Sequence, residues 1–438
     1  MKANDSHEFL PHPRPYYPWL ILSISLLFQY YKQLLLISPS VMVGELALKY
    51  SLDTDQLGLL TAMAMYSFFI FQIPFAILID KWGVRRIASL AILITALGSI
   101  LFGYAPTATY AFIGRFLIGL GSSVALVNIV KIVANWFKPT MFAFLIGVAI
   151  ALGALGDLTG IYLTDALIQA VGASTAMLNY GLLGIIFAII FFLVVRDNAP
   201  GAQYDINPKV QRLKLSSTIF RMLKRKQTWI ITLFSGFAQT TFPVFLGLWG
   251  IAYLKAKYQY SEAESLAVHA SFFVGLILAS PLMGYLSTRV KRRKIFIIIA
   301  VLIATLLSIG IGNLTSPPIS LNFAMFFLQG VAFGTFPLCL AIMREQNVSL
   351  ISATSFAFAN STYAIFAAIA DQAIGTLFNF QWHNTLFKGI VDVSSHEFYS
   401  FLLRATLWLG LSLILSLFIK ETYAKQKIKE DLSSDPSK

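Results

Sequence analysis

The chain has little cysteine and little charge. Its single cysteine, Cys339, excludes an intrachain disulfide and a metal cluster held by cysteines. Charged residues make up 12% of the 438 residues, whereas soluble globular proteins carry about 25%. Hydrophobic residues make up 57%, and the mean hydropathy is +0.73. Because so little polar surface is available, the chain is predicted to be an integral membrane protein.

The residues needed for enzymatic or metal chemistry are also scarce. The five histidines, at positions 7, 12, 269, 383 and 396, lack the spacing of metal ligands. The sequence has no phosphate-binding loop with which to use ATP. We therefore expect no enzyme activity, no cofactor and no metal. The residues before Trp19 lack the charged region and cleavage site of a signal peptide, so the first apolar run is predicted to be a retained helix.

Apolar runs of membrane-spanning length dominate the sequence. Twelve can be counted, and each is predicted to form a helix. The runs cover residues 18–42, 56–79, 86–105, 108–136, 140–165, 175–195, 228–253, 265–287, 294–312, 319–343, 350–378 and 398–420. The predicted fold class is an all-α polytopic membrane protein with twelve transmembrane helices.

One long polar connection, residues 196–227, lies halfway along the chain. It is predicted to be a cytoplasmic linker between six-helix bundles at 18–195 and 228–420, with terminal tails at 1–17 and 421–438. Basic and apolar residues are interleaved in the part of the linker that runs from Phe220 to Lys226. This pattern fits a short helix on an anionic membrane surface, and it fits a solvated linker equally well.

Positive charge is distributed unevenly between the predicted connections. If the N-terminus is cytoplasmic, the loops on the opposite side carry only Lys49, Lys255, Lys257 and Lys388. Cytoplasmic loops of membrane proteins carry the excess of lysine and arginine. We therefore expect both termini to be cytoplasmic, in a plasma membrane of the bacterial inner-membrane type. This asymmetry accounts for most of the net charge of +13, so nucleic acid is not an expected partner.

The two halves share weak internal similarity, which is consistent with a repeat. Three segments recur in the same order at similar offsets. They are 79–86 with 286–293, Trp19 and Gln29 with Trp229 and Gln239, and 153–157 with 367–371.

A short polar turn separates the second and third runs. Gly83 permits a sharp change of direction, and Asp80 can accept hydrogen bonds from backbone N–H groups at a helix start or from arginines. Together with Arg85 and Arg86, these residues resemble the loop 2–3 signature of the major facilitator superfamily, G-x-x-x-D-x-x-G-R-R. Ala76 stands in place of the leading glycine. The resemblance implies that this turn braces one conformational state.

A second segment carries the same resemblance. Arg115, Gly119 and Gly121 are similar to the R-x-x-x-G-x-G pattern of the fourth helix in that family. The resemblance extends over residues 18–420. It implies two six-helix bundles related by an axis along the membrane normal, with substrate held between them near the midplane. It also implies that Arg115 takes part in proton handling or substrate binding.

The fifth run is rich in glycine, as it is in facilitators. Asp157 stands where the drug–proton antiporters of this family keep a proline. This difference counts against a multidrug exporter.

Charged side chains inside apolar helices are costly, so each is a functional candidate. Lys32 lies about halfway along the first run, close to Gln29 and Tyr30, and can hold a carboxylate or phosphate as a point charge. Gln239 is the repeat counterpart of Gln29. We predict that these four residues contact substrate. The alternative for Lys32 is a permanent pair with a helix acid.

Lys131 and Asn128 share one face of the fourth run. They are predicted to contact substrate if that face lines the cavity. Alternatively, Lys131 extends to the membrane interface. Arg344 is its candidate repeat partner, and the adjacent Glu345 offers Arg344 an ion pair.

Asp157 and Asp371 are the acids of the fifth and eleventh runs. Burial penalises the charged form of a carboxylate, whereas a nearby arginine such as Arg115 favours it. This competition would let an acid take up and release a proton, so the three residues are predicted to couple transport to protons. The alternatives are a gate between the halves and a structural pair of Asp with Arg.

The predicted function is secondary transport of a small organic anion or zwitterion (a carboxylate, amino acid or peptide-like molecule), coupled to protons. The expected partners are this substrate, protons and the lipid bilayer, and we expect the chain to work as a monomer. One alternative is a larger metabolite such as a carboxylate siderophore, moved in either direction. A second is a membrane sensor or scaffold that does not transport.

Overall fold

The computed structural model describes residues 15–198, 215–239, 250–348, 351–381 and 395–425. The side chains of 43, 54, 215, 252, 256, 367, 370–381 and 395–405 lie outside that description. The described residues form helices and no strands. The first seven helices are α1 (Tyr17–Tyr50), α2 (Thr54–Trp82), α3 (Val84–Gly103), α4 (Ala108–Ser122), α5 (Ala125–Trp136), α6 (Phe142–Val171) and α7 (Ala173–Val194). The others are α9 (Leu215–Lys224), α10 (Lys226–Gln239), α12 (Gly250–Tyr258), α13 (Glu262–Val290), α14 (Lys294–Asn313), α15 (Ile319–Phe333), α16 (Phe336–Glu345), α17 (Ser352–Gln381) and α18 (Ser395–Phe418).

The all-α polytopic fold is confirmed. Within the described residues, nine spans are long and apolar enough to cross a membrane. They match the first six predicted runs and the eighth, ninth and tenth. The remaining three runs fall on α10 with α12, on α17 and on α18, which border or contain residues outside the description. The total of twelve spans therefore stays a prediction.

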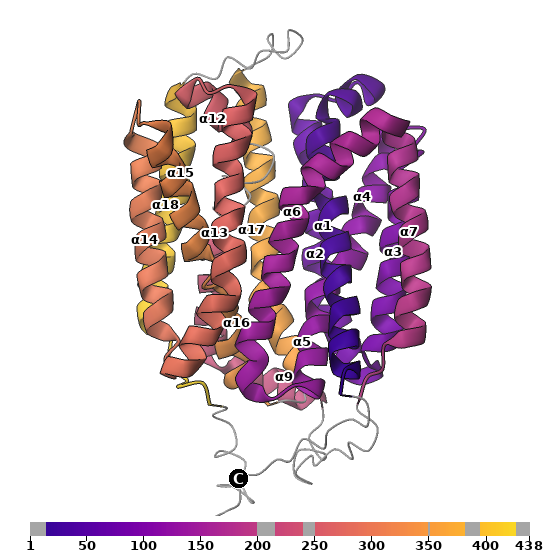
Figure 1. The fold of residues 1–438 in the computed structure, drawn as a ribbon, viewed down its shortest axis with the longest axis vertical. Helices are drawn as coiled ribbons and strands as arrows, with labels where there is room; N and C mark the ends of the chain where they lie inside the picture. Colours follow the sequence, from indigo (N-terminus) through magenta and orange to yellow (C-terminus); the bar gives the residue numbers. More distant parts are fainter. Residues whose placement is uncertain (1–14, 199–214, 240–249, 349–350, 382–394, 426–438) are drawn as a thin grey trace, which may run out of the picture.

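The helices form two bundles that lie side by side, with α1–α7 on the right of Figure 1 and α10–α18 on the left. We call the end at which α1 begins and α18 ends the linker end, because α9 of the linker lies there, at the bottom of Figure 1. The opposite end is the far end. Lipid offers no hydrogen bonds, so helices that satisfy their own backbone groups are the structures that these apolar runs can adopt.

Features of the two bundles recur at the offsets of the sequence repeat. Asp53 caps the start of α2 with Gln56, and Ser261 caps the start of α13 with Glu264. Pro74 lies inside α2, and Pro281 lies inside α13. The fourth span of each bundle is interrupted, between α4 and α5 and between α15 and α16.

The bundles meet mainly along two helix pairs, α2 with α17 and α6 with α13. Glycine allows the second pair to approach closely at the linker end. A Cβ on Gly284 would meet the backbone carbonyl of Ala143, and a Cβ on Gly147 would meet the backbone of Ser280. Small residues let helix backbones come together in membranes, so these glycines hold the linker end closed in this structure.

We expect Gly284→Val to prevent this closure, because its side chain would collide with backbone atoms of α6. Spin labels at the exposed residues Lys138 and Lys291, one in each bundle, would report the separation at the linker end. The distance distribution should shift to longer values. Gly410→Val is the matched control, since a Cβ at Gly410 would have no atom within 4 Å. An unchanged distribution in Gly284→Val would contradict the role of this contact.

Candidate functional site

A cavity of about 180 Å³ lies between the bundles. α1, α2, α5 and α6 line it from one side, and α10, α13, α15, α16 and α17 line it from the other. Its wall is mostly apolar and includes the rings of Phe68, Phe273, Phe333 and Phe336. The polar side chains that line it include Gln29, Lys32, Gln33, Asp157, Gln239 and Asn360.

Lys32 supplies the positive charge of this cavity. Its side chain is 7% exposed, and its ammonium lies 5.2 Å from the centre of the Phe68 ring. Among the described residues, no side chain forms an ion pair or a hydrogen bond with it. Asp157 interacts with it electrostatically without direct contact. The alternative of a permanent ion pair between Lys32 and a helix acid therefore does not describe this structure.

Asp157 faces the same cavity from α6. It is 8% exposed, and its Oδ2 accepts a hydrogen bond of 2.7 Å from Nε2 of Gln33 on α1. The glycines of α6 make this contact possible, because a Cβ on Gly156 would lie 3.0 Å from Cβ of Gln33. The glycine-rich pattern therefore brings the acid of the fifth span beside the lysine of the first.

Two glutamines related by the sequence repeat line opposite walls of this cavity. Gln29 on α1 is 5% exposed and has no hydrogen-bond partner among the described residues. Gln239 lines the opposite wall, and its Nε2 donates to the carbonyl oxygen and the hydroxyl of Ser235 at 3.3 Å each. Of the six predicted substrate contacts, Lys32, Gln29 and Gln239 line the cavity.

The other predicted residues lie elsewhere. Tyr30 shares a hydrogen bond of 2.7 Å with the hydroxyl of Thr159, away from the cavity lining. Asn128 is fully buried and donates to the carbonyl oxygen of Val124 within its own helical segment. The side chain of Asp371 lies outside the description.

Arg115 is fully buried and is committed to the backbone of α1. Its guanidinium donates to the carbonyl oxygens of Leu35, at 2.9 Å, and Leu36, at 3.4 Å. The described structure contains no Arg115–Asp157 ion pair. The expected competition between Arg115 and Asp157 therefore has no direct contact behind it in this conformation, and the proposed role of Arg115 stays a prediction.

Lys131 requires a correction, because it neither lines the cavity nor extends to the membrane interface. Its ammonium forms a buried ion pair of 2.7 Å with Oδ1 of Asp80. An acid at the end of α2 and a cation on α5 meet once the helices pack, which the linear spacing does not reveal.

The Asp80 carboxylate also joins the two bundles. Its Oδ2 accepts hydrogen bonds from the backbone N–H of Thr354, at 2.9 Å, and from the Thr354 hydroxyl, at 2.8 Å. Thr354 lies in the first turn of α17, where backbone N–H groups are free and the helix dipole favours negative charge. The sequence offered two kinds of donor to Asp80, backbone N–H groups at a helix start and arginines. The donor here is a helix start, but that helix belongs to the second bundle.

The remaining residues of the polar turn bind within the first bundle. The backbone N–H of Arg85 donates to Oδ1 of Asp197 at 2.9 Å, and Nε of Arg85 donates to the carbonyl oxygen of Phe192. Gly83 has φ +88°, and a Cβ there would lie 2.5 Å from Cγ of Asp197. Glycine is therefore needed for both conformation and space. Arg86 is exposed.

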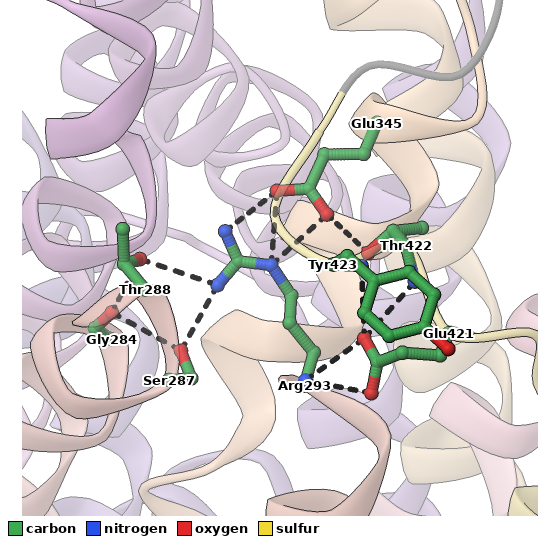
Figure 2. Close-up of polar contacts among 8 residues, drawn as sticks. All are labelled: Gly284, Ser287, Thr288, Arg293, Glu345, Glu421, Thr422 and Tyr423. Atoms are coloured by element: carbon green, nitrogen blue, oxygen red, sulfur yellow. Dashed lines mark hydrogen bonds and ion pairs between the residues drawn. The ribbon is translucent and has the colours of Figure 1, made fainter. Parts of the chain in front are cut away.

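Figure 2 shows the equivalent corner of the second bundle, where the polar network centres on Arg293. This side chain is 2% exposed, and its guanidinium binds the Glu345 carboxylate at 2.6–3.0 Å and the Ser287 hydroxyl at 3.0 Å. Glu421 accepts the backbone N–H groups of Arg293 and Lys294 at the start of α14. It corresponds to Asp197, which lies just after the last helix of the first bundle.

Glu345 is thus paired with Arg293 and is not the direct partner of Arg344. The guanidinium of Arg344 instead lies 4.0 Å from the centre of the Phe142 ring on α6, in the other bundle. The alternative of an ion pair between the adjacent residues Arg344 and Glu345 is therefore wrong for this structure.

Sequence reasoning missed Gln33, Asp197, Glu421 and Thr354. A signal existed for the two acids, since an aliphatic residue, a basic residue and an acid stand at the end of the last apolar run of each half, at 195–197 and 419–421. A signal also existed for Gln33, because it follows Gln29 by four residues and so shares its helix face. Thr354 had no local signal, because its partner is 274 residues away.

Comparisons with known proteins agree with this arrangement. The family model described as Major Facilitator Superfamily matches residues 20–370. The probable nitrate/nitrite transporter NarK2 of Mycobacterium tuberculosis (strain ATCC 25618 / H37Rv) is 26% identical over 301 residues, which are 67% of this chain and 73% of that protein. The hexuronate transporter of Bacillus subtilis (strain 168) is 22% identical over 346 residues, 73% of this chain and 79% of its own.

A solved structure of the proton:xylose symporter XylE, bound to 6-bromo-6-deoxy-D-glucose, has the same fold. It superimposes with a TM-score of 0.73 at 15% identity, over 94% of this chain and 97% of the other.

We expect Asp80→Asn to destabilise the closed linker end, because it leaves Lys131 without a counter-charge and weakens the contact with Thr354. Loss of one partner of a buried ion pair costs about 3–5 kcal/mol. The labels at Lys138 and Lys291 should then report a largely open linker end. Asp165→Asn, at an exposed acid of the same bundle, is the control. A distribution equal to that of the unsubstituted chain would refute the brace.

Proposed function

Because this chain belongs to the major facilitator superfamily, we propose that it is a secondary transporter that moves a small organic anion together with a proton, by alternating access of its two bundles. The observation that carries the proposal is Lys32, a buried cation in the cavity wall that lies over the Phe68 ring and has no ion pair or hydrogen bond among the described residues. A buried charge is stable when it is paired, and substrate is the group that can pair with it.

The charge balance of the cavity supports the joint binding of an anion and a proton. Lys32 and an ionised Asp157 sum to zero, so an anion that enters alone adds an unbalanced negative charge. When Asp157 is protonated, the cavity carries the charge of Lys32, and a monovalent anion neutralises it. Anion and proton therefore favour each other's binding through Coulomb energy in a medium of low dielectric.

The substrates named for two relatives support an anionic substrate. NarK2 is described as a nitrate/nitrite transporter and the protein of Bacillus subtilis as a hexuronate transporter, and both substrates are anions. The closed linker end is one of the two states that alternating access requires. The polar turn at Asp80 stabilises this state because it ties α2 to the start of α17.

The distribution of charge supports one orientation of the transporter. Exposed basic residues at the linker end include Lys81, Arg86, Lys138, Lys291 and Arg292. On the positive-inside rule, we place the linker end and both termini on the cytoplasmic side of a bacterial-type inner membrane. We also propose that the transporter functions as a monomer, because one chain contributes both walls of the cavity.

A zwitterion is the second candidate. Lys32 and Asp157 present opposite charges at separate points of one cavity, which suits a molecule such as an amino acid. The two candidates differ in pH dependence. A zwitterion needs Asp157 ionised and binds less well at acidic pH, whereas an anion that binds with a proton binds better there. No described feature favours a siderophore-sized substrate or a sensor without transport.

We expect Lys32→Ala to weaken anion binding by about ten- to a hundredfold, the effect of losing one hydrogen bond to a charged group. Lys32→Arg should retain part of the affinity, because it keeps the charge but changes its shape. Binding of radiolabelled nitrate, lactate, gluconate and glucuronate to purified protein would measure this. Equal affinity of Lys32→Ala and the unsubstituted chain for every anion bound would show that Lys32 is structural.

Asp157→Asn should separate transport from proton coupling, since asparagine resembles the protonated acid. In proteoliposomes, exchange of labelled anion down its own gradient should persist, while accumulation driven by a pH gradient should be lost. Asp165→Asn should keep both activities. If Asp157→Asn still accumulates anion on a pH gradient, the proton binds elsewhere.

A further inference from the structure

Beside Lys32, α1 presents hydrogen-bonding groups that have no partner among the described residues. Gln29 lies three residues before Lys32, so the two side chains share one helix face. Both are more than nine-tenths buried and both line the cavity. The amide of Gln29 has no hydrogen-bond partner among the described residues, and its Oε1 is buried.

Gln33 adds a second unmatched acceptor. Its Nε2 is used by Asp157, whereas its Oε1 is buried without a partner in the described structure. Buried polar atoms in native proteins are almost always satisfied, and exceptions at a cavity indicate a ligand or water. The unmatched set on this wall is therefore one ammonium, one amide that both donates and accepts, and one carbonyl oxygen.

The chemistry of this set discriminates between ligands. Nitrate has acceptors only, so it would leave both carbonyl oxygens unmatched. An ammonium group donates but cannot accept, and Lys32 repels it. A hydroxyl group donates and accepts, which is what the Gln29 amide needs from a neighbour.

We propose that the substrate is a hydroxylated carboxylate, whose carboxylate binds Lys32 while a neighbouring hydroxyl binds Gln29. A further hydroxyl would donate to Oε1 of Gln33. This inference rests on the proposed function and deepens it, because it assigns selectivity to Gln29. It also separates the chemistry of the two relatives, since a hexuronate is a hydroxylated carboxylate and nitrate is not.

The experiment compares ligands that differ in one group. Propionate, L-lactate and L-alanine share a three-carbon frame and carry hydrogen, hydroxyl or ammonium at the same carbon. Hexanoate and D-gluconate make the same comparison at six carbons, and nitrate represents inorganic anions. Dissociation constants would be measured by calorimetry on the purified full-length protein.

We expect lactate to bind at least about tenfold more tightly than propionate, and gluconate more tightly than hexanoate by a larger factor, since each hydroxyl adds a hydrogen bond to a buried group. Gln29→Leu should abolish the preference for lactate while leaving propionate binding within about threefold. A purely structural defect would weaken both ligands together.

Gln72→Leu is the matched control. Gln72 on α2 is also fully buried, and its amide also lacks a described partner, but it does not line the cavity. The same substitution there should leave the ratio of lactate to propionate affinity unchanged.

The outcomes separate this inference from the proposed function. If lactate and propionate bind equally and both depend on Lys32, the anion transporter stands and the hydroxyl selectivity is wrong. Tightest binding of alanine or nitrate would also overturn the selectivity, in favour of a zwitterion or an inorganic anion. If no anion binding depends on Lys32, the proposed function itself fails.

Discussion

Asp80 is the residue on which the closed arrangement of the two bundles depends. One carboxylate oxygen is paired with Lys131 of its own bundle, and the other accepts two hydrogen bonds from Thr354 of the second bundle. Because the side chain is fully buried, its charge is stable only with both partners in place. Separation of the bundles at the linker end removes Thr354 as a partner. The free energy of burying the Asp80 carboxylate therefore depends on whether the two bundles are in contact.

The charges of this protein fall into two groups with different consequences. At the linker end, Asp80, Arg293 and their partners form networks whose hydrogen-bonding capacity is used within the protein. In the cavity, Lys32 lies over the Phe68 ring and has no ion pair or hydrogen bond within the described part of the chain, where Gln29 and Gln33 also keep unmatched atoms. Satisfied buried networks favour one arrangement of the chain, whereas unmatched groups leave binding energy for a ligand.

The two halves of the internal repeat share an arrangement of helices, but their buried polar contacts differ. An acid after the last helix of each bundle binds the start of the third helix, as Asp197 does at Arg85 and Glu421 does at Arg293. The buried ion pairs differ, since the first joins α2 to α5 and the second joins the start of α14 to α16. The cations of the two fourth spans also differ. Lys131 pairs with an acid of its own bundle, whereas Arg344 contacts the Phe142 ring of the opposite bundle. The two halves therefore close against each other by unlike contacts.

The sequence alone was sufficient for the fold class, for nine of the spans within the described residues and for the family, because a lipid environment leaves long apolar runs few alternatives to helices. It also pointed to Lys32 and Asp157, since a charge inside an apolar run is visible without a structure.

Which groups face one another was decided by tertiary packing. Lys131 and Asp80 are 51 residues apart, and Gln33 and Asp157 are 124 residues apart. A helix pattern specifies the face on which a side chain lies, but its partner depends on the axial position of the neighbouring helix. That position is fixed by contacts such as those of Gly156 on Gln33 and Gly284 on Ala143, which exist only once the helices have packed.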